Sequence, residues 1–225
     1  MTKFLNRRKL LFAGLAILTV APASYAAAQA EHPFYGGANF TRDPALVPPA
    51  ESPIDFPITM GESDQLPAKF RRQQVTIGSQ EQPGTIIVDA DHKYLYFILG
   101  GDQAIRYGVG VGREGFVWSG RAEVGMKRRW PRWVPPEEMV GRDIKAAKWA
   151  NGMPGGPENP LGARALYLNA NGVDTLYRIH GTNDPSSIGK ALSSGCVRLL
   201  NEDIADLFER AKIGTQVLVL APGTL

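Results

Sequence analysis

The chain has 225 residues of ordinary globular composition, with 25 basic and 22 acidic residues. That length is enough for one domain with a sizeable core plus extensions. The four basic residues before position 30 account for the excess, because without them 21 basic residues face 22 acidic ones, a net charge of −1. So balanced a chain gives no reason to expect a nucleic acid as partner.

Residues 1–30 have the pattern of a cleaved secretory signal peptide. A basic start is followed by an apolar run over residues 10–21 and then by small residues, with candidate cleavage points after Ala26, Ala28 or Ala30. The run is short for a bilayer span, which needs about 20 apolar residues, and no cysteine lies at its end. We therefore expect export to the periplasm or cell envelope, by the general secretory or the twin-arginine route, with no membrane anchor in the mature protein.

Residues 31–82 are rich in proline, with Pro48 and Pro49 in succession, which argues against a separately packed domain. Two alternatives remain, a flexible linker or an extended strap that lies on the following domain. Several large apolar side chains favour the strap. They are Phe34, Tyr35, Phe40, Ile54, Phe56 and Phe70.

From Pro83 the sequence predicts short strands with no long helix between them, which indicates an antiparallel arrangement at the start of the domain. The polar residues 89–93 have the composition of a hairpin turn, and Gly100-Gly101 marks a second turn. The expected strands are residues 85–88, 94–98, 105–111 and 122–130. The fold class that we predict is mainly β, with sandwich-like mixed sheets and a few short helices.

A basic cluster lies at the end of the fourth expected strand and consists of Lys127, Arg128, Arg129 and Arg132. It is either a solvated face or a wall for an anionic substrate, since arginine pairs well with carboxylates. Two short helices are expected near residues 135–138 and 143–149. The glycine- and proline-rich residues 151–160 cannot form regular structure and are either a connector or a substrate-gating loop.

Strands are expected again at residues 165–168 and 175–179, and the second ends at His180. Asn201 has the side chain of a helix N-cap. Four apolar residues follow it at helical spacing, and we expect Gly214 to end the helix before a last strand at residues 216–220. The four apolar residues are Ile204, Leu207, Phe208 and Ala211.

The chemistry of the chain is concentrated in Cys196, its only cysteine, and His180, sixteen residues upstream. An imidazole can take the proton of a thiol, and the thiolate–imidazolium pair is a strong nucleophile. Gly195 allows a tight turn, in which the backbone N–H groups of Ser194, Gly195 and Cys196 can form an oxyanion hole. The alternative is that Cys196 is a buried structural cysteine, but the polar, turn-rich surroundings are unfavourable for one.

These residues also resemble a known family. His180-Gly181-Thr182, the run from Ser193 to Leu199, and Asn201 are similar to the signature of the L,D-transpeptidase (YkuD-type) catalytic domain. The resemblance places that domain at residues 83–221. One departure is Ser194, which stands where many members carry histidine, so proton transfer would depend on His180 alone.

The resemblance implies an exported cysteine transpeptidase that acts on peptidoglycan stem peptides through an acyl-enzyme on Cys196 and needs no cofactor. It implies that the carbonyl of Gly181 orients the ring of His180 and that Ser193 and Arg198 bind substrate. For Arg198, an alternative is that it holds the cysteine loop. The three histidines, His32, His92 and His180, are too scattered for a metal site.

The acyl acceptor is left open by the sequence. It could be the amine of a second stem peptide, an amine of an envelope protein, a free D-amino acid, or water. With water as acceptor the protein would be an L,D-carboxypeptidase. A murein-binding module without activity is a further alternative, although it predicts loss of the Cys–His pair. A papain-type peptidase is disfavoured because its cysteine precedes its histidine in the chain.

Overall fold

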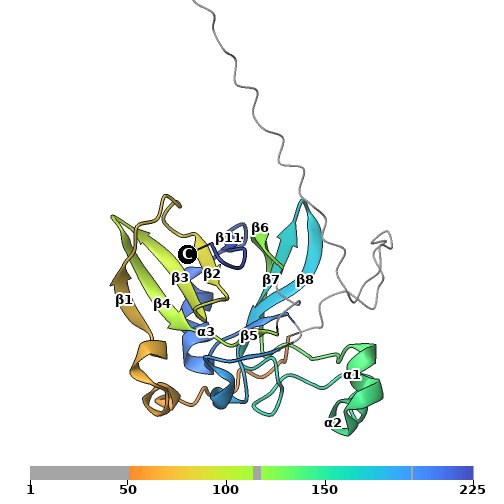
Figure 1. Ribbon diagram of the computed structural model, residues 1–225. Coiled ribbons are helices and arrows are strands. Elements are labelled where there is room, and N and C mark those ends of the chain that lie inside the picture. Colours follow the sequence, from red (N-terminus) through yellow and green to blue (C-terminus); the bar gives the residue numbers. More distant parts are fainter. Residues whose placement is uncertain (1–50, 114–117, 194, 225) are drawn as a thin grey trace, which may run out of the picture. The chain divides into compact units, whose positions relative to one another are not determined.

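The structure is a computed structural model and describes residues 51–113, 118–193 and 195–224. The predicted signal peptide and residues 31–50 lie outside the described residues. Within the described ranges, nine strands form one mixed sheet in the order β1-β4-β3-β2-β11-β6-β7-β8-β10, and β5 pairs with β9 in a second sheet (Figure 1). The predicted fold class, mainly β with a few short helices, is confirmed. No helix in these ranges has the length and apolar character of a membrane span.

The elements are short, and their bounds follow the chain. The strands are β1 (Gln73–Thr76), β2 (Ile86–Asp89), β3 (Tyr94–Gly100), β4 (Gln103–Gly108), β5 (Val111–Gly112), β6 (Gly120–Arg129), β7 (Arg164–Ala170), β8 (Val173–His180), β9 (Ala191–Ser193), β10 (Val197–Arg198) and β11 (Gln216–Val219). The α-helices are α1 (Glu137–Arg142), α2 (Ile144–Ala147) and α3 (Asn201–Arg210), and the 3₁₀ turns are Glu62–Gln65, Ala68–Phe70 and Pro185–Ser187.

Strands β2, β3 and β4 form the antiparallel meander that the short predicted strands, with turn residues and no long helix between them, indicate. The strand expected over residues 105–111 is wrong in its length, because β4 ends at Gly108 and the chain continues into the second sheet as β5. A side chain at Gly108 would place its Cβ 2.3 Å from the carbonyl oxygen of Phe70. Close contact with a segment far away in the sequence therefore requires glycine at the end of this strand, and no local pattern shows that contact.

Helix α3 packs one face on the sheet, and the four apolar residues expected there are all buried. The prediction that Asn201 caps this helix is wrong. Leu200 occupies the N-cap position, and the Oδ1 atom of Asn201 accepts a hydrogen bond from the N–H of Ala163 at 2.8 Å. The helix also ends earlier than expected, at Arg210, and Gly214 instead supplies a left-handed turn (φ 83°) that leads to β11.

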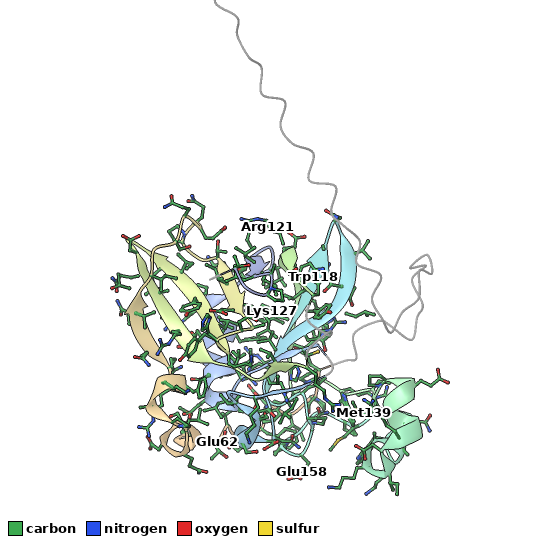
Figure 2. All side chains as sticks on the ribbon, in the orientation of Figure 1. Glu62, Trp118, Arg121, Lys127, Met139 and Glu158 are labelled. Carbon is green, nitrogen blue, oxygen red and sulfur yellow. The ribbon has the colours of Figure 1, made fainter. Side chains whose placement is uncertain are left out.

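The basic cluster of β6 is mostly tied to other parts of the chain. Figure 2 labels Lys127, whose Nζ donates hydrogen bonds to the carbonyls of Phe208 and Ala211 at the end of α3. A cation there compensates the exposed carbonyls of the last helical turn. Arg129 pairs with Asp55 at 3.5 Å, and Arg132 donates to a carbonyl of the loop after α2. These contacts give the cluster a structural role that neither sequence alternative contained.

Of the described part of the proline-rich segment (residues 51–82), residues 51–76, called the strap from here on, pack on the domain. Its first anchor is Trp130, which is 1% exposed and has a positive φ of 39°. The Nε1–H of Trp130 donates to Asp55 at 3.0 Å, and its ring meets Phe56 edge-on with centroids 5.5 Å apart. Asp55 also accepts two hydrogen bonds from the guanidinium of Arg164, at 3.0 and 3.2 Å.

The second anchor of the strap lies against the chain between His180 and Cys196. Leu66 is buried in a small cluster with Ile188 and Leu200, and Phe70 packs against it. Gly189 is needed there, since a Cβ at this position would sit 2.4 Å from the ring of Phe70. Glu202, in the first turn of α3, accepts hydrogen bonds from the backbone N–H groups of Gly61 and Ser63. The strap therefore supports the chain that leads to the cysteine.

The irregular structure expected for residues 151–160 is present, but this loop is held at both sides. Asn159 is fully buried, and its Nδ2 donates to the carbonyls of Pro131 at 3.1 Å and Pro154 at 2.9 Å. Gly155 lies so close to Trp130 that a Cβ would come within 1.7 Å of its carbonyl oxygen. An opening motion of the whole loop would break these contacts, so the structure gives the gating alternative no support.

Asp203, in the first turn of α3, is a buried carboxyl group with incomplete pairing. Its side chain is 2% exposed, the Nε of Arg72 lies 3.6 Å from Oδ1, and Oδ2 has no hydrogen-bond partner among the described residues. Burial raises the pKa of Asp203 to about 7, against the charge of Arg72, and the neighbouring carboxylates of Glu202 and Asp206 act in the same direction as burial.

We predict that Asp203→Asn removes a pH dependence of stability. The native carboxyl holds its proton to about pH 7, whereas the unfolded one loses it near its ordinary pKa of about 3.9. The native state thus binds more protons between these values, and its stability falls as pH rises through that window, by at most about 4 kcal/mol. Urea denaturation should show the variant gaining stability relative to wild type from pH 4 to pH 8. A difference independent of pH would contradict this.

Candidate active site

The two residues singled out by the sequence meet at one edge of the large sheet. Strand β10 pairs in parallel with β8, with Val197 opposite Ile179 and Arg198 opposite His180, and the N–H of Leu199 donates to the carbonyl of His180 at 2.9 Å. Cys196 immediately precedes β10 and so lies level with Arg178. The turn before it requires Gly195, whose φ is 123°.

Alternation along the strands separates a core face from a site face. Ile179 and Val197 point into the hydrophobic core. Because side chains alternate along a strand, Arg178 and His180 point to the opposite face, where Tyr167 and Ala165 of β7 are their cross-strand neighbours. The imidazole thus lies outside the apolar core, on a strand whose opposite face is packed into that core.

His180 is 5% exposed, and its Nδ1 lies 2.6 Å from the carbonyl oxygen of Gly181. A carbonyl only accepts, so Nδ1 carries the hydrogen, and in the neutral ring Nε2 is the basic nitrogen. The pKa of His180 is lowered to about 4: burial is the main cause, the charges of Arg198 and Arg178 act in the same direction, and hydrogen bonding to the carbonyls of Gly181 and Leu161 opposes them. The ring is therefore neutral at pH 7.

Cys196 is half-buried as a residue, and burial raises the pKa of its thiol. The charge and the backbone N–H of Arg178 and the charge of Arg198 act against burial, while the carboxylate of Asp174 reinforces it. Thiol and imidazole are thus both shifted toward their neutral forms. This differs from the thiolate–imidazolium pair that the sequence suggested, because that expectation took no account of burial.

Arg198 is a half-buried cation whose donors are not all used. Its Nε and Nη2 atoms are buried and have no hydrogen-bond partner among the described residues. Burial lowers the pKa of Arg198, and the carboxylate of Asp184 opposes this. Buried guanidinium donors without partners are costly, and an anionic ligand is one way to satisfy them.

The remaining expected site residues are only partly described. Ser194 lies outside the described residues, and Ser193 contributes its backbone to β9, opposite Gly112 of β5. A cavity of about 20 Å³, room for roughly one water molecule, adjoins Gly195. Its lining is Val88, Ala90, Val111, Gly112, Trp118, Leu168, Tyr177, Arg178, Gly195, Val197 and Val219.

Sequence reasoning missed the pairing of Arg178 with Asp174. Two hydrogen bonds of 2.6 and 2.8 Å join the guanidinium to the carboxylate. Residues four apart in a regular strand lie about 13 Å from each other. The contact arises because β8 is irregular at Leu176, which has a φ of 64° and donates its N–H to Asp174. No sequence pattern indicates that irregularity.

Residues 83–219, more than half of the chain, match the family model of the L,D-transpeptidase catalytic domain, YkuD. The chain belongs to this family. The resemblance seen in the sequence is thereby confirmed, and the matched L,D-transpeptidase domain contains both His180 and Cys196. The strap lies before the matched residues.

Named relatives agree with the family. The "Probable L,D-transpeptidase YbiS" of Escherichia coli K12 is 35% identical over 155 residues, which cover 64% of this chain and 47% of the relative. This L,D-transpeptidase-family chain thus spans about half the length of the curated relatives it matches.

Solved structures give weaker likenesses. A crystal structure titled a probable carnitine operon oxidoreductase, from Brucella melitensis, is 46% identical, with a TM-score of 0.47 and coverage of 69% of this chain and 97% of that one. An L,D-transpeptidase from Mycobacterium smegmatis is 17% identical, with a TM-score of 0.45 and coverage of 61% and 58%. The family assignment depends on the family model and not on these likenesses.

We predict that the ring of His180 is neutral, with its hydrogen on Nδ1, throughout the neutral pH range. Long-range ¹⁵N–¹H NMR spectra of protein labelled at histidine nitrogen distinguish the two tautomers and the charged ring. The titration midpoint should lie near the pKa of about 4 that burial produces. A midpoint near the ordinary histidine value of about 6.5, or a hydrogen on Nε2, would contradict the geometry at Gly181.

Proposed function

We propose that this protein is an exported cysteine L,D-transpeptidase that acts on peptidoglycan stem peptides. The observation that carries the proposal is the sheet-edge arrangement in which His180, with Nδ1 held by Gly181, ends the strand next to β10, and Cys196 immediately precedes β10. Membership of the family supplies the reaction class, and the names of the relatives supply the type of bond. The proposed site of action is the periplasm or cell envelope, in keeping with the expected signal peptide.

In the first half-reaction, the thiol of Cys196 gives its proton to Nε2 of His180 as sulfur attacks the carbonyl of the acyl donor. The backbone N–H groups of Gly195 and Cys196, with that of Ser194, stabilise the oxyanion. The tetrahedral intermediate then collapses to a thioester. The bond to the terminal D-amino acid breaks, and the leaving amine takes the proton from His180.

In the second half-reaction, an acceptor amine attacks the thioester. His180 removes a proton from this amine, a new amide bond forms, and the proton returns to the sulfur of Cys196, so that the enzyme is regenerated. A neutral imidazole is the form required at the start of both halves. The pKa of about 4 for His180 therefore keeps the base ready over a wide pH range.

The test is to incubate the mature protein with tetrapeptide muropeptides and to weigh the products. Transfer predicts cross-linked dimers with release of the terminal D-amino acid. Trimming to tripeptides alone would make water the acceptor and the protein an L,D-carboxypeptidase. Unchanged muropeptides that nevertheless bind would indicate a murein-binding module. An envelope-protein acceptor would appear as a muropeptide adduct on that protein.

We predict that Cys196→Ala abolishes product formation and that His180→Ala reduces the rate at least about a hundredfold, the lower end of general acid–base contributions. His92→Ala is the matched control, because it removes an exposed imidazole that pairs with Asp89 on another strand, and it should keep its activity. Retention of more than a few per cent of activity in the cysteine variant would rule out the covalent mechanism.

We predict that Arg198 binds the C-terminal carboxylate of the acyl donor, because its buried Nε and Nη2 have no partner among the described residues. Arg198→Gln should raise KM about tenfold or more for a tetrapeptide donor, about the loss of one charge-assisted hydrogen bond. It should affect a donor that ends in a carboxamide much less. Equal losses for both donors would instead assign Arg198 to holding the cysteine loop.

A further inference from the structure

A transfer that begins with a neutral thiol must stabilise a thiolate as the proton leaves. The neutral imidazole of His180 provides no positive charge at rest. Two guanidinium groups do, and they act unequally. Arg178 lowers the pKa of the Cys196 thiol more than Arg198 does, whereas Arg198 lowers the pKa of the His180 imidazole more than Arg178 does. Compared with Arg198, Arg178 therefore stabilises the thiolate more and destabilises the protonated imidazole less.

The geometry of β8 places Arg178 for this role. The parallel register puts Cys196 level with it, and the backbone N–H of Arg178 is a hydrogen-bond donor to the sulfur. Arg178 also lines the small cavity that adjoins Gly195, the residue before the nucleophile. The backbone of Arg178 thus approaches the sulfur, and its side chain, level with Cys196 in the register, carries a positive charge that lowers the pKa of the thiol.

The guanidinium is held in a fixed position. Its side chain is 13% exposed, it makes the two hydrogen bonds to Asp174, and its Nη1 donates to the carbonyl of Tyr177 at 2.9 Å. One face lies over the ring of Tyr167, 4.4 Å from the ring centroid. A cation that is fixed before the reaction needs no reorganisation when the thiolate forms.

The pairing depends on a strained feature of the backbone. Leu176 adopts a positive φ of 64°, which is unfavourable for a residue other than glycine. This irregularity brings Asp174 within reach of Arg178. Irregularities of this kind in strands are concentrated next to active sites, where they redirect side chains. Asp174 both fixes the cation and, as a carboxylate, partly cancels its charge at the sulfur.

We propose that the guanidinium of Arg178, fixed by Asp174 and by the ring of Tyr167, supplies the positive charge that stabilises the thiolate of Cys196. Asp174 limits that effect. The inference rests on the proposed function in so far as it assumes that the thiolate is the reacting form. The titratable and charged groups around the sulfur are Arg178, Asp174, Tyr177 and His180 on β8, Tyr167 on β7, and Arg198 on β10.

The proposal is tested by the pH dependence of alkylation of the mature protein with iodoacetamide, followed by intact mass. Cys196 is the only cysteine, so every added carbamidomethyl group reports on it. Arg178→Gln should raise the midpoint by about one pH unit, and Asp174→Asn should lower it. The midpoint is the readout, because the rate at one pH also depends on intrinsic nucleophilicity.

Arg210→Gln is the matched control. Arg210 forms the same kind of pair with Asp206, four residues earlier, through hydrogen bonds of 2.9 and 3.0 Å on helix α3. It changes the net charge equally and should leave the midpoint unchanged, which separates a local effect from one of total charge.

An unchanged midpoint in folded Arg178→Gln, or a raised one in Asp174→Asn, would overturn the proposal. If Arg178→Gln does not fold, Asp174→Asn decides alone, since asparagine keeps the shape of aspartate. Alkylation requires no muropeptide, so the two proposals fail separately. Shifted midpoints in a protein that forms no transfer products would refute the function only, and an active enzyme with unshifted midpoints would refute the role of Arg178 only.

Discussion

The site depends on the parallel pairing of β10 with β8. Only two residue pairs make this contact, Val197 with Ile179 and Arg198 with His180, yet it brings a thiol and an imidazole sixteen residues apart to one sheet edge. A ladder so short needs support. Arg198 exchanges two backbone hydrogen bonds with Gly110, of 2.7 and 2.9 Å, and Leu199, which follows it, is fully buried.

Further support comes from a part of the chain outside the matched family domain. The strap places Leu66 and Phe70 against Ile188 and Gly189, which lie on the connection between the two site residues. The carboxylate of Glu202 fastens the strap to the start of α3. Burial of one large apolar side chain stabilises a fold by about 1.5–3 kcal/mol. The stabilisation from burying these strap side chains is therefore large compared with that from the two residue pairs between β8 and β10.

Burial is also what sets the chemistry. Burial of the site disfavours charge on both groups, so the thiol pKa of Cys196 rises and the imidazole pKa of His180 falls. The same burial strengthens each remaining charge. Arg178 and Arg198 therefore influence the site more than surface arginines would, and the hydrogen bond between His180 and Gly181 leaves Nε2 as the basic nitrogen of the neutral ring.

Much of this arrangement could be predicted from the sequence, where local pattern decides the structure. Turn residues between short apolar runs predicted the β2–β4 meander, helical spacing predicted the buried face of α3, and the signature around Cys196 predicted the family. The failures share a cause, since each depends on a distant partner. Asn201 bonds to Ala163 instead of capping its helix, and Phe70 lies against Gly108, where β4 ends.

The Arg178–Asp174 pair could not be predicted for a related reason. Its two residues are on the same strand but at a spacing that regular strand geometry keeps apart, and only the left-handed backbone at Leu176 joins them. Similarly, Lys127 looked like part of a charged surface because its acceptors, the carbonyls at the end of α3, lie about eighty residues further along the chain.

The most direct test of the account is to trap the covalent intermediate. The mature protein is mixed with a tetrapeptide donor in the absence of an acceptor amine, quenched in acid within seconds and weighed intact. The account predicts a mass increase equal to the donor minus its terminal D-amino acid, located on the peptide that contains Cys196. Turnover of the donor without any such adduct, or an adduct that persists in Cys196→Ala, would contradict it.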